Sequence, residues 1–208
     1  MTKEMNLRPS ISKEEISAIE EVASFSGTIH LIETEEETVR ALQALRDERV
    51  VGFDTESKPV FRRDEQAEVS LIQIATLTDA YLFRINKIGF TQELCDFITN
   101  PDIYKIGLSL HDDYKVMRRK MQLTPQGFVE LQKLCPGYGI KDSGLQRIYA
   151  ILFNERISKT QRVTNWEAKQ LTPKQIGYAA LDAYACLRIY NFLMKLPRPH
   201  PLCFALIQ

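Results

Sequence analysis

The 208-residue sequence contains no apolar run of the roughly 20 residues that a membrane-spanning helix requires. Its first 15 residues, MTKEMNLRPSISKEE, lack the apolar core of a secretory signal peptide. Low-complexity segments and internal repeats are also absent, which excludes repeat architectures. We therefore expect a soluble, cytoplasmic protein that makes no membrane contact. One domain over residues 1–208 is expected, because single domains reach roughly 200–250 residues.

Cysteine is scarce, and its spacing excludes two kinds of site. The four cysteines, Cys95, Cys135, Cys186 and Cys203, form no CxxC pair and lie too far apart for a zinc knuckle. We expect reduced thiols that pack as small apolar side chains. Zinc and dithiol redox chemistry are therefore not indicated.

Net charge is also absent, since 27 basic residues balance 27 acidic ones. This balance argues against a protein that coats nucleic acid without specificity. The charge is unevenly distributed, however: residues 1–104 hold 11 Lys/Arg and 20 Asp/Glu, whereas residues 105–208 hold 16 and 7. The basic second half, including KVMRRKM at 115–121, could form a phosphate-attracting rim. A solvated helix face is the commoner meaning of such a run.

Strand and helix signals alternate along the chain, with strands predicted at 28–33, 50–56, 68–76, 79–85, 103–110 and 128–132. The second, third and fourth of these should form an antiparallel meander. Helices are predicted at about 12–24, 34–46, 91–99, 111–121, 142–153 and from 173 onward. This order predicts an α/β fold with a mixed five- to six-stranded sheet flanked by helices, the N-terminal helix being an extension.

The stretch VVGFDTES at 50–57 sets two carboxylates, Asp54 and Glu56, two residues apart on a strand. Alternate strand residues share one face, so these two negative charges should lie side by side. Like charges this close repel unless a positive charge sits between them. A bound cation explains the pair, although a solvated strand end is the commoner explanation of a single acidic pair.

A third acidic residue is expected beside an aromatic one on the last helix. In YAALDAYA at 178–185, Tyr178 and Asp182 are four residues apart and project from one helix face. The alanines around them would let the helix approach a sheet closely. Asp182 would then be partly buried, which is costly without a cation. An exposed Asp beside a packed Tyr is the alternative.

Two more acidic residues, Asp112 and Asp113, begin a helix within KIGLSLHDDYKVM at 105–117. Acidic residues are favoured at a helix N-terminus, so one of them could be only a cap. Asp113 precedes Val116 and Met117 by one turn, whereas Asp112 precedes Lys115. This spacing predicts that Asp113 faces the sheet.

Taken in order, these three motifs resemble those of the DEDDy group of 3'-5' exonucleases. That group includes proofreading exonuclease domains, ribonuclease D and the Werner-syndrome exonuclease domain. The segments VSLIQIAT at 69–76, YLF at 81–83 and NW at 165–166 are also similar to this family. The resemblance covers most of the chain and implies a ribonuclease H-like fold.

The resemblance implies a two-metal site that uses Mg²⁺ or Mn²⁺. Asp54 would bridge both cations, Glu56 and Asp182 would hold the one that activates water, and Asp113 would support the second. Tyr178 would orient the attacking water. Lys159 could contact a phosphate and Trp166 could stack or simply pack, packing being the simpler interpretation of Trp166.

The implied function is hydrolysis of single-stranded nucleic acid from the 3' end, releasing nucleoside 5'-monophosphates. Whether the substrate is RNA or DNA stays open at this point. Two alternatives also stay open: a nucleic-acid-binding module without catalysis, and an enzyme restricted to short oligonucleotides.

Overall fold

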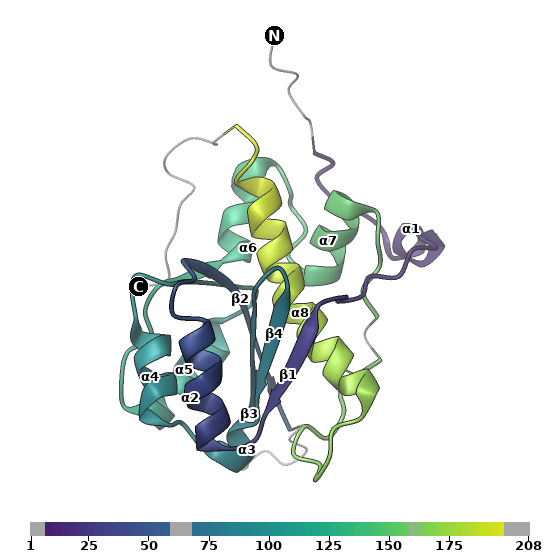
Figure 1. Ribbon diagram of the computed structural model, residues 1–208. Helices are drawn as coiled ribbons and strands as arrows, with labels where there is room; N and C mark the ends of the chain where they lie inside the picture. The colour runs from purple at the N-terminus through teal and green to yellow at the C-terminus, as the bar shows by residue number, and fades with distance from the viewer. Residues whose placement is uncertain (1–6, 59–67, 159, 162, 198–208) are drawn as a thin grey trace.

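A computed structural model describes residues 7–58, 68–158, 160–161 and 163–197 of the chain. Its centre is a six-stranded mixed sheet in the order β1-β4-β3-β2-β5-β6 (Figure 1). The strands are β1 (Thr28–Ile32), β2 (Val50–Ser57), β3 (Val69–Ala75), β4 (Asp79–Phe83), β5 (Tyr104–Gly107) and β6 (Phe128–Glu130). The meander β2-β3-β4 is antiparallel, as predicted, and the outer strands join it in parallel.

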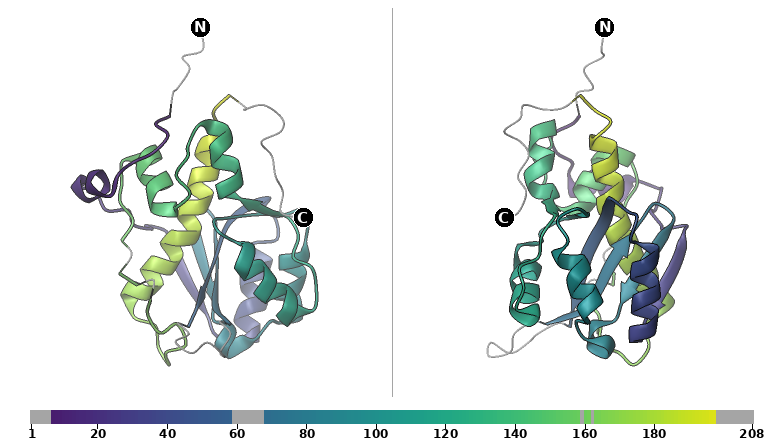
Figure 2. Two further views of the ribbon diagram at one scale, coloured as in Figure 1. Left: turned by 180° about the vertical axis from the view of Figure 1, so that it is seen from behind. Right: turned by 60° about the vertical axis from the view of Figure 1, so that its left-hand side comes forward.

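Helices cover both faces of this sheet (Figure 2). They are α1 (Lys13–Ala18), α2 (Glu35–Ala44), α3 (Ile85–Ile88), α4 (Gln92–Thr99), α5 (His111–Met121), α6 (Leu131–Leu134), α7 (Leu145–Phe153) and α8 (Pro173–Leu193), with a 3-10 turn, η1, at Cys135–Tyr138. The side chains of α2, α4 and α5 pack on one face of the sheet around Phe53 and Ile74. The opposite face packs against α8. None of the described helices is both long and apolar enough to cross a membrane.

Capping residues fix where helices α2 and α8 begin. Thr34 accepts a hydrogen bond from the Glu37 amide, and Thr172 accepts one from the Gln175 amide. In both helices the side chain of the later residue bonds back to the cap, so each forms a complete capping box. Pro173 fills the first turn of α8, where its missing N–H has no cost.

Small residues bring α8 close to the middle of the sheet. A Cβ atom added at Gly52 of β2 would lie 1.9 Å from the carbonyl oxygen of Ala183. Ala179 and Ala180 are fully buried in the same contact. The close approach that the alanine-rich helix predicted is therefore present, and it sets the distance between the carboxylates of β2 and α8.

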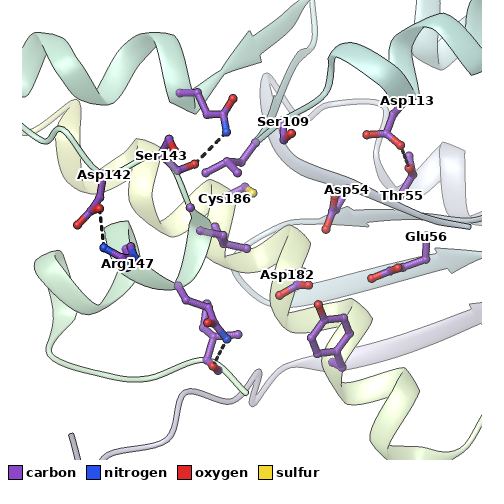
Figure 3. A pocket seen from close by; sticks show the side chains of 17 residues that line it. Asp54, Thr55, Glu56, Ser109, Asp113, Asp142, Ser143, Arg147, Asp182 and Cys186 are labelled. Atoms are coloured by element: carbon purple, nitrogen blue, oxygen red, sulfur yellow. Dashed lines mark hydrogen bonds and ion pairs between the residues drawn. The ribbon is translucent and has the colours of Figure 1, made fainter. Parts of the chain in front are cut away.

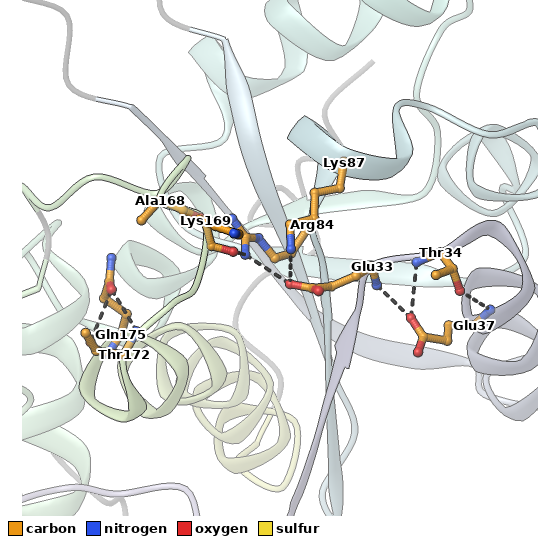
Figure 4. Close-up of polar contacts among 9 residues, drawn as sticks. All are labelled: Glu33, Thr34, Glu37, Arg84, Lys87, Ala168, Lys169, Thr172 and Gln175. Atoms are coloured by element: carbon orange, nitrogen blue, oxygen red, sulfur yellow. Dashed lines mark hydrogen bonds and ion pairs between the residues drawn. The ribbon is translucent and has the colours of Figure 1, made fainter.

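A buried arginine holds the loop that leads into α8. The Arg84 side chain has no exposed surface, and its guanidinium donates to the carbonyls of Ala168 and Lys169 and to Glu33 (Figure 4). Lys87 also pairs with Glu33, at 2.6 Å. These bonds tie the ends of β1 and β4 to the segment before Thr172, so the start of α8 has a fixed position.

Several sequence predictions need correction. The N-terminal helix expected over 12–24 is only α1, because Ile19 is extended and Val22 forms a bridge with Arg156. Strand β5 ends at Gly107, three residues earlier than predicted, since Ser109 takes a positive φ of 64°. The short helices α3 and α6 and the turn η1 were not predicted.

The described cysteines behave as packed thiols. Cys95, Cys135 and Cys186 are free and buried. Burial raises the pKa of the Cys135 thiol to about 12, so it stays protonated at neutral pH. Cys203 lies outside the described residues.

Candidate active site

Three carboxylates from two elements converge at one end of the sheet. Asp54 and Glu56 project from β2, and Asp182 projects from α8 (Figure 3). One carboxylate oxygen from each residue lies within 4.8 Å of the others. The cluster therefore confirms that the i, i+2 pair on β2 shares a face and that Asp182 points toward the sheet.

The electrostatics of this cluster favour a bound cation. Burial raises the pKa of Asp54 well above its ordinary value, and the negative charges of Asp182, Glu56 and Asp113 raise it further. A charged Asp54 is thus disfavoured unless positive charge is supplied. Carboxylate oxygens are the ligands that hard divalent cations such as Mg²⁺ prefer, so these donors fit that kind of ion.

Asp113 joins the site from the first turn of α5. It lines the same cleft, and the Thr55 hydroxyl donates a hydrogen bond of 2.5 Å to its carboxylate. Burial raises the pKa of Asp113, and the hydrogen bond from Thr55 opposes that rise. Asp112 instead faces solvent, 3.6 Å from Lys115. The structure thus places Asp113 on the sheet side, as its spacing predicted, but outside the close group of three.

Tyr178 lies one helical turn before Asp182 and lines the cleft. Burial raises the pKa of its hydroxyl above the usual range, and the charge of Asp182 and a hydrogen bond to it act in the same direction. The hydroxyl therefore stays protonated and can donate. Trp166 packs behind it, with ring centroids 6.2 Å apart. The Trp166 side chain is fully buried, so it supports Tyr178 and has no surface for stacking on a base. Lys159 lies outside the described residues.

A polar wall that the sequence did not reveal faces the carboxylates across a cleft of about 620 Å³. It consists of the loop before α7 and the first turn of that helix: Asp142, Ser143, Gly144, Leu145, Gln146 and Arg147. Asp142, Ser143 and Arg147 lie on the far side of the cleft from Glu56 in Figure 3. Their loop has no motif of its own, so only the packing of distant segments identifies them.

A buried glutamate shapes the turn between β5 and α5. The Glu130 carboxylate accepts hydrogen bonds from the amides of Ser109, Leu110 and Gln132 at 2.9–3.0 Å. Ser109 lines the cleft in a left-handed conformation that is unusual for a residue other than glycine. Glu130 thus holds the turn that delivers Asp113, a role that its place in FVELQ did not indicate.

The fold and the site define a class of proteins: nucleases of ribonuclease H-like fold with an acidic cluster at the end of the sheet. Within that class, the chain belongs to the 3'-5' exonuclease family, which matches residues 29–197.

Individual relatives agree with this assignment. The bifunctional 3'-5' exonuclease/ATP-dependent helicase WRN of Mus musculus is 33% identical in an alignment of 160 positions that covers 73% of this chain and 11% of that protein. A ribonuclease D of Gluconacetobacter diazotrophicus is 26% identical, over 79% of this chain and 42% of its own. The chain thus spans less than half the length of these relatives.

Solved structures share the fold. The Aedes aegypti Nibbler EXO domain superposes with a TM-score of 0.73 at 20% identity, covering 84% of this chain and 92% of that one. Escherichia coli RNase D gives a TM-score of 0.73 at 24% identity, covering 80% of this chain and 44% of that one.

Proposed function

We propose that this protein is a metal-dependent 3'-5' exonuclease that hydrolyses single-stranded nucleic acid to nucleoside 5'-monophosphates. The observation that carries the proposal is the convergence of Asp54, Glu56 and Asp182 within 4.8 Å. Tyr178 adds a protonated hydroxyl at the same place. Membership of the 3'-5' exonuclease family supports this reaction.

Each group in the site has a distinct part in this proposal. Asp54, Glu56 and Asp182 would hold two divalent cations, Mg²⁺ or Mn²⁺, with Asp113 completing the set. Such cations polarise a phosphate, lower the pKa of water and clamp an in-line displacement. The Tyr178 hydroxyl would orient the attacking water, which needs a hydrogen bond and no proton loss. Thr55 would hold Asp113 in place.

RNA is the substrate that we propose first, because a ribonuclease D is among the relatives of this chain. One structure with the same fold is a Trypanosoma brucei RNase D complex with RNA U12, at a TM-score of 0.71 and 18% identity. The WRN relative, in contrast, is a 3'-5' exonuclease joined to an ATP-dependent helicase. We propose RNA as the first substrate to test, with DNA as the direct competitor.

End-labelled oligomers test the reaction and the substrate together. RNA and DNA single strands, with free or blocked 3' ends, are incubated with Mn²⁺, with Mg²⁺ or with EDTA. The proposal expects a ladder shortened from free 3' ends, nucleoside 5'-monophosphates as product, and no reaction in EDTA. Cleavage that ignores the 3' block, or a product with a 3'-phosphate, would contradict it.

The same assay separates the two alternatives. A binding module without catalysis would leave the oligomer uncut in Mn²⁺, although all four carboxylates that the resemblance implies are present here. An enzyme restricted to short oligonucleotides would cut a trimer much faster than a 20-mer. Asp54→Asn is the control for contaminating nucleases, because it keeps the shape of the side chain and removes its charge.

A further inference from the structure

The first described residues form an arm, residues 7–23, that precedes the part of the chain matched by the family. The arm contains α1, which Figure 1 draws beside α7 and away from the sheet. It makes hydrogen bonds at two places, and both are next to residues that line the cleft.

The first attachment is to the loop before α7. The Pro9 carbonyl accepts hydrogen bonds from the amides of Lys141 and Asp142, at 2.7 and 3.3 Å. The Ile11 amide donates to the Asp142 carboxylate at 2.8 Å. Arg147 Nη1 donates to both the Ile11 carbonyl and the Asp142 carboxylate, each at 3.0 Å. Two residues of the cleft wall, Asp142 and Arg147, are therefore bonded to the backbone of the arm.

The second attachment is at Arg156, beside the cleft residue Ile157. The Arg156 Nε donates to the Ile19 carbonyl, and its backbone exchanges hydrogen bonds with Glu21 and Ala23, all at 2.9–3.0 Å. At the two attachments, the side chains of Ile11 and Ile19 are also buried, since both residues are at most 8% exposed and pack on α7. The arm thus holds both ends of α7.

The wall held in this way is electrically neutral, because Arg147 pairs with Asp142 within it. Among the described residues that line the cleft, Arg147 is the only lysine or arginine, and five others are aspartate or glutamate. A nucleic-acid strand is negatively charged, so its path through an acidic cleft needs a neutral or basic wall on one side. Fixed placement of such a wall matters, because a shift of about 1 Å can cost about 10²-fold in rate.

We propose that residues 7–23 are a positioning element of the substrate cleft, which holds the Asp142–Arg147 wall against the nucleotides upstream of the 3' end. The proposal rests on the proposed function, since it takes the ligand to be a nucleic-acid strand. It assigns the arm no contact with the reacting atoms. The affinity for a mononucleotide, which would bind only at the carboxylates, should therefore depend on the arm far less than the affinity for an oligomer.

Binding measured in Ca²⁺ tests this without requiring hydrolysis. The variant Ile11→Ala/Ile19→Ala loosens the arm, and Val22→Ala is the matched control, because the Val22 side chain is 45% exposed in the same arm. Fluorescence anisotropy gives the Kd of a labelled single-stranded 12-mer, and calorimetry gives the Kd of a nucleoside 5'-monophosphate. Hydrogen exchange reports the amides of Lys141 and Asp142, which donate to Pro9.

The double variant should bind the 12-mer about tenfold more weakly, a loss of about 1.4 kcal/mol. The mononucleotide should change less than twofold, and both amides should exchange faster. Equal losses for both ligands, or faster exchange without any change in binding, would overturn the proposal. Arg156→Met, which removes one hydrogen bond, replaces the double variant if that variant fails to fold. Failure of the wild type to bind the 12-mer also overturns the proposal, whereas binding without hydrolysis refutes only the exonuclease reaction.

Discussion

Asp54 shows how a residue can weaken the fold while it serves the site. Its raised pKa means that ionisation at neutral pH opposes folding of the metal-free protein. Asp54→Asn should therefore raise the free energy of unfolding in EDTA by about 1 kcal/mol or more at pH 7. The gain should shrink as the pH falls, because the aspartate then takes up a proton and loses its charge. Urea unfolding at pH 7 and pH 5 measures both effects, and a less stable variant at pH 7 would contradict this account.

Tyr178→Phe tests the orienting role by removing one hydroxyl and keeping the ring that packs on Trp166. If that hydroxyl orients water, kcat should fall by about one to three orders of magnitude, while binding of the oligomer changes little. Single-turnover kinetics in Mn²⁺ and anisotropy in Ca²⁺ measure the two quantities. An unchanged kcat would make Tyr178 a packing residue.

At this scale, strand and helix periodicity predicted which side chains share a face, namely Asp54 with Glu56 and Tyr178 with Asp182. The expectation that Asp54, Glu56, Asp113 and Asp182 meet in one site came from the resemblance to the 3'-5' exonucleases, and all four line the cleft. The supporting residues could not be predicted in the same way. Glu130 acts through amides about 20 residues away, which no local pattern reveals.

The orientation of helix α5 decides which of its two aspartates, Asp112 or Asp113, enters the site. Because Asp113 accepts from Thr55 and Asp112 faces solvent, Asp113→Asn should reduce kcat by at least about 10²-fold. Asp112→Asn should change it less than twofold. Thr55→Val, which removes the hydroxyl and keeps the shape, should have an intermediate effect that Thr55→Ser restores. Equal effects at 112 and 113 would show that α5 does not deliver Asp113 as the structure indicates.

Strand β5 carries a buried lysine that ties it to the end of α4. Lys105 Nζ donates to the carbonyls of Phe97 and Asn100 at 3.3 and 2.7 Å, and its side chain has no exposed surface. Burial lowers its pKa to about 7. Between pH 7 and about 10.5 the unfolded chain binds a proton that the folded chain does not, so stability rises with pH in this window.

Lys105→Met should remove that rise. Between pH 7.5 and 9.5, the free energy of unfolding of the wild type should increase by about 2 kcal/mol relative to the variant. Exposed Lys133 provides the control, since Lys133→Met should leave the pH dependence unchanged. Parallel pH profiles for wild type and Lys105→Met would show that the two carbonyls keep Lys105 charged.

Elements with strong local signals were predicted and those fixed by tertiary contacts were not. The capping boxes of α2 and α8 and the meander β2-β3-β4 follow from neighbouring residues. The edge position of β1 depends on pairing with β4, about 50 residues later, and α1 ends where the chain turns to meet Arg156. Such long-range pairing leaves no periodic trace in the sequence.

At the scale of the whole molecule, basic residues could attract a nucleic-acid strand from inside the cleft or from the surface outside it. Residues 105–208 hold 16 Lys/Arg against 7 Asp/Glu, yet only Arg147 of the described basic residues lines the cleft. Among the described residues, any further basic contact to phosphate must therefore come from outside the cleft. The last turn of α5, with Arg118, Arg119 and Lys120, is one such cluster; the other predicted cluster includes Lys159 and Arg162, which lie outside the described residues.

Salt dependence distinguishes a basic rim from an ordinary solvated surface. Each phosphate contact to a single strand contributes about −0.7 to the slope of log K against log salt. Replacing Arg118, Arg119 and Lys120 with Gln should therefore flatten the slope for a 12-mer by up to about 2, with the mononucleotide unaffected. Gln at Arg40, Arg46 and Arg49 removes the same charge from the acidic half and should leave the slope unchanged. If both triple variants flatten the salt slope equally, net charge alone attracts the oligomer. If neither variant flattens it, the last turn of α5 does not lie on the path of the bound oligomer.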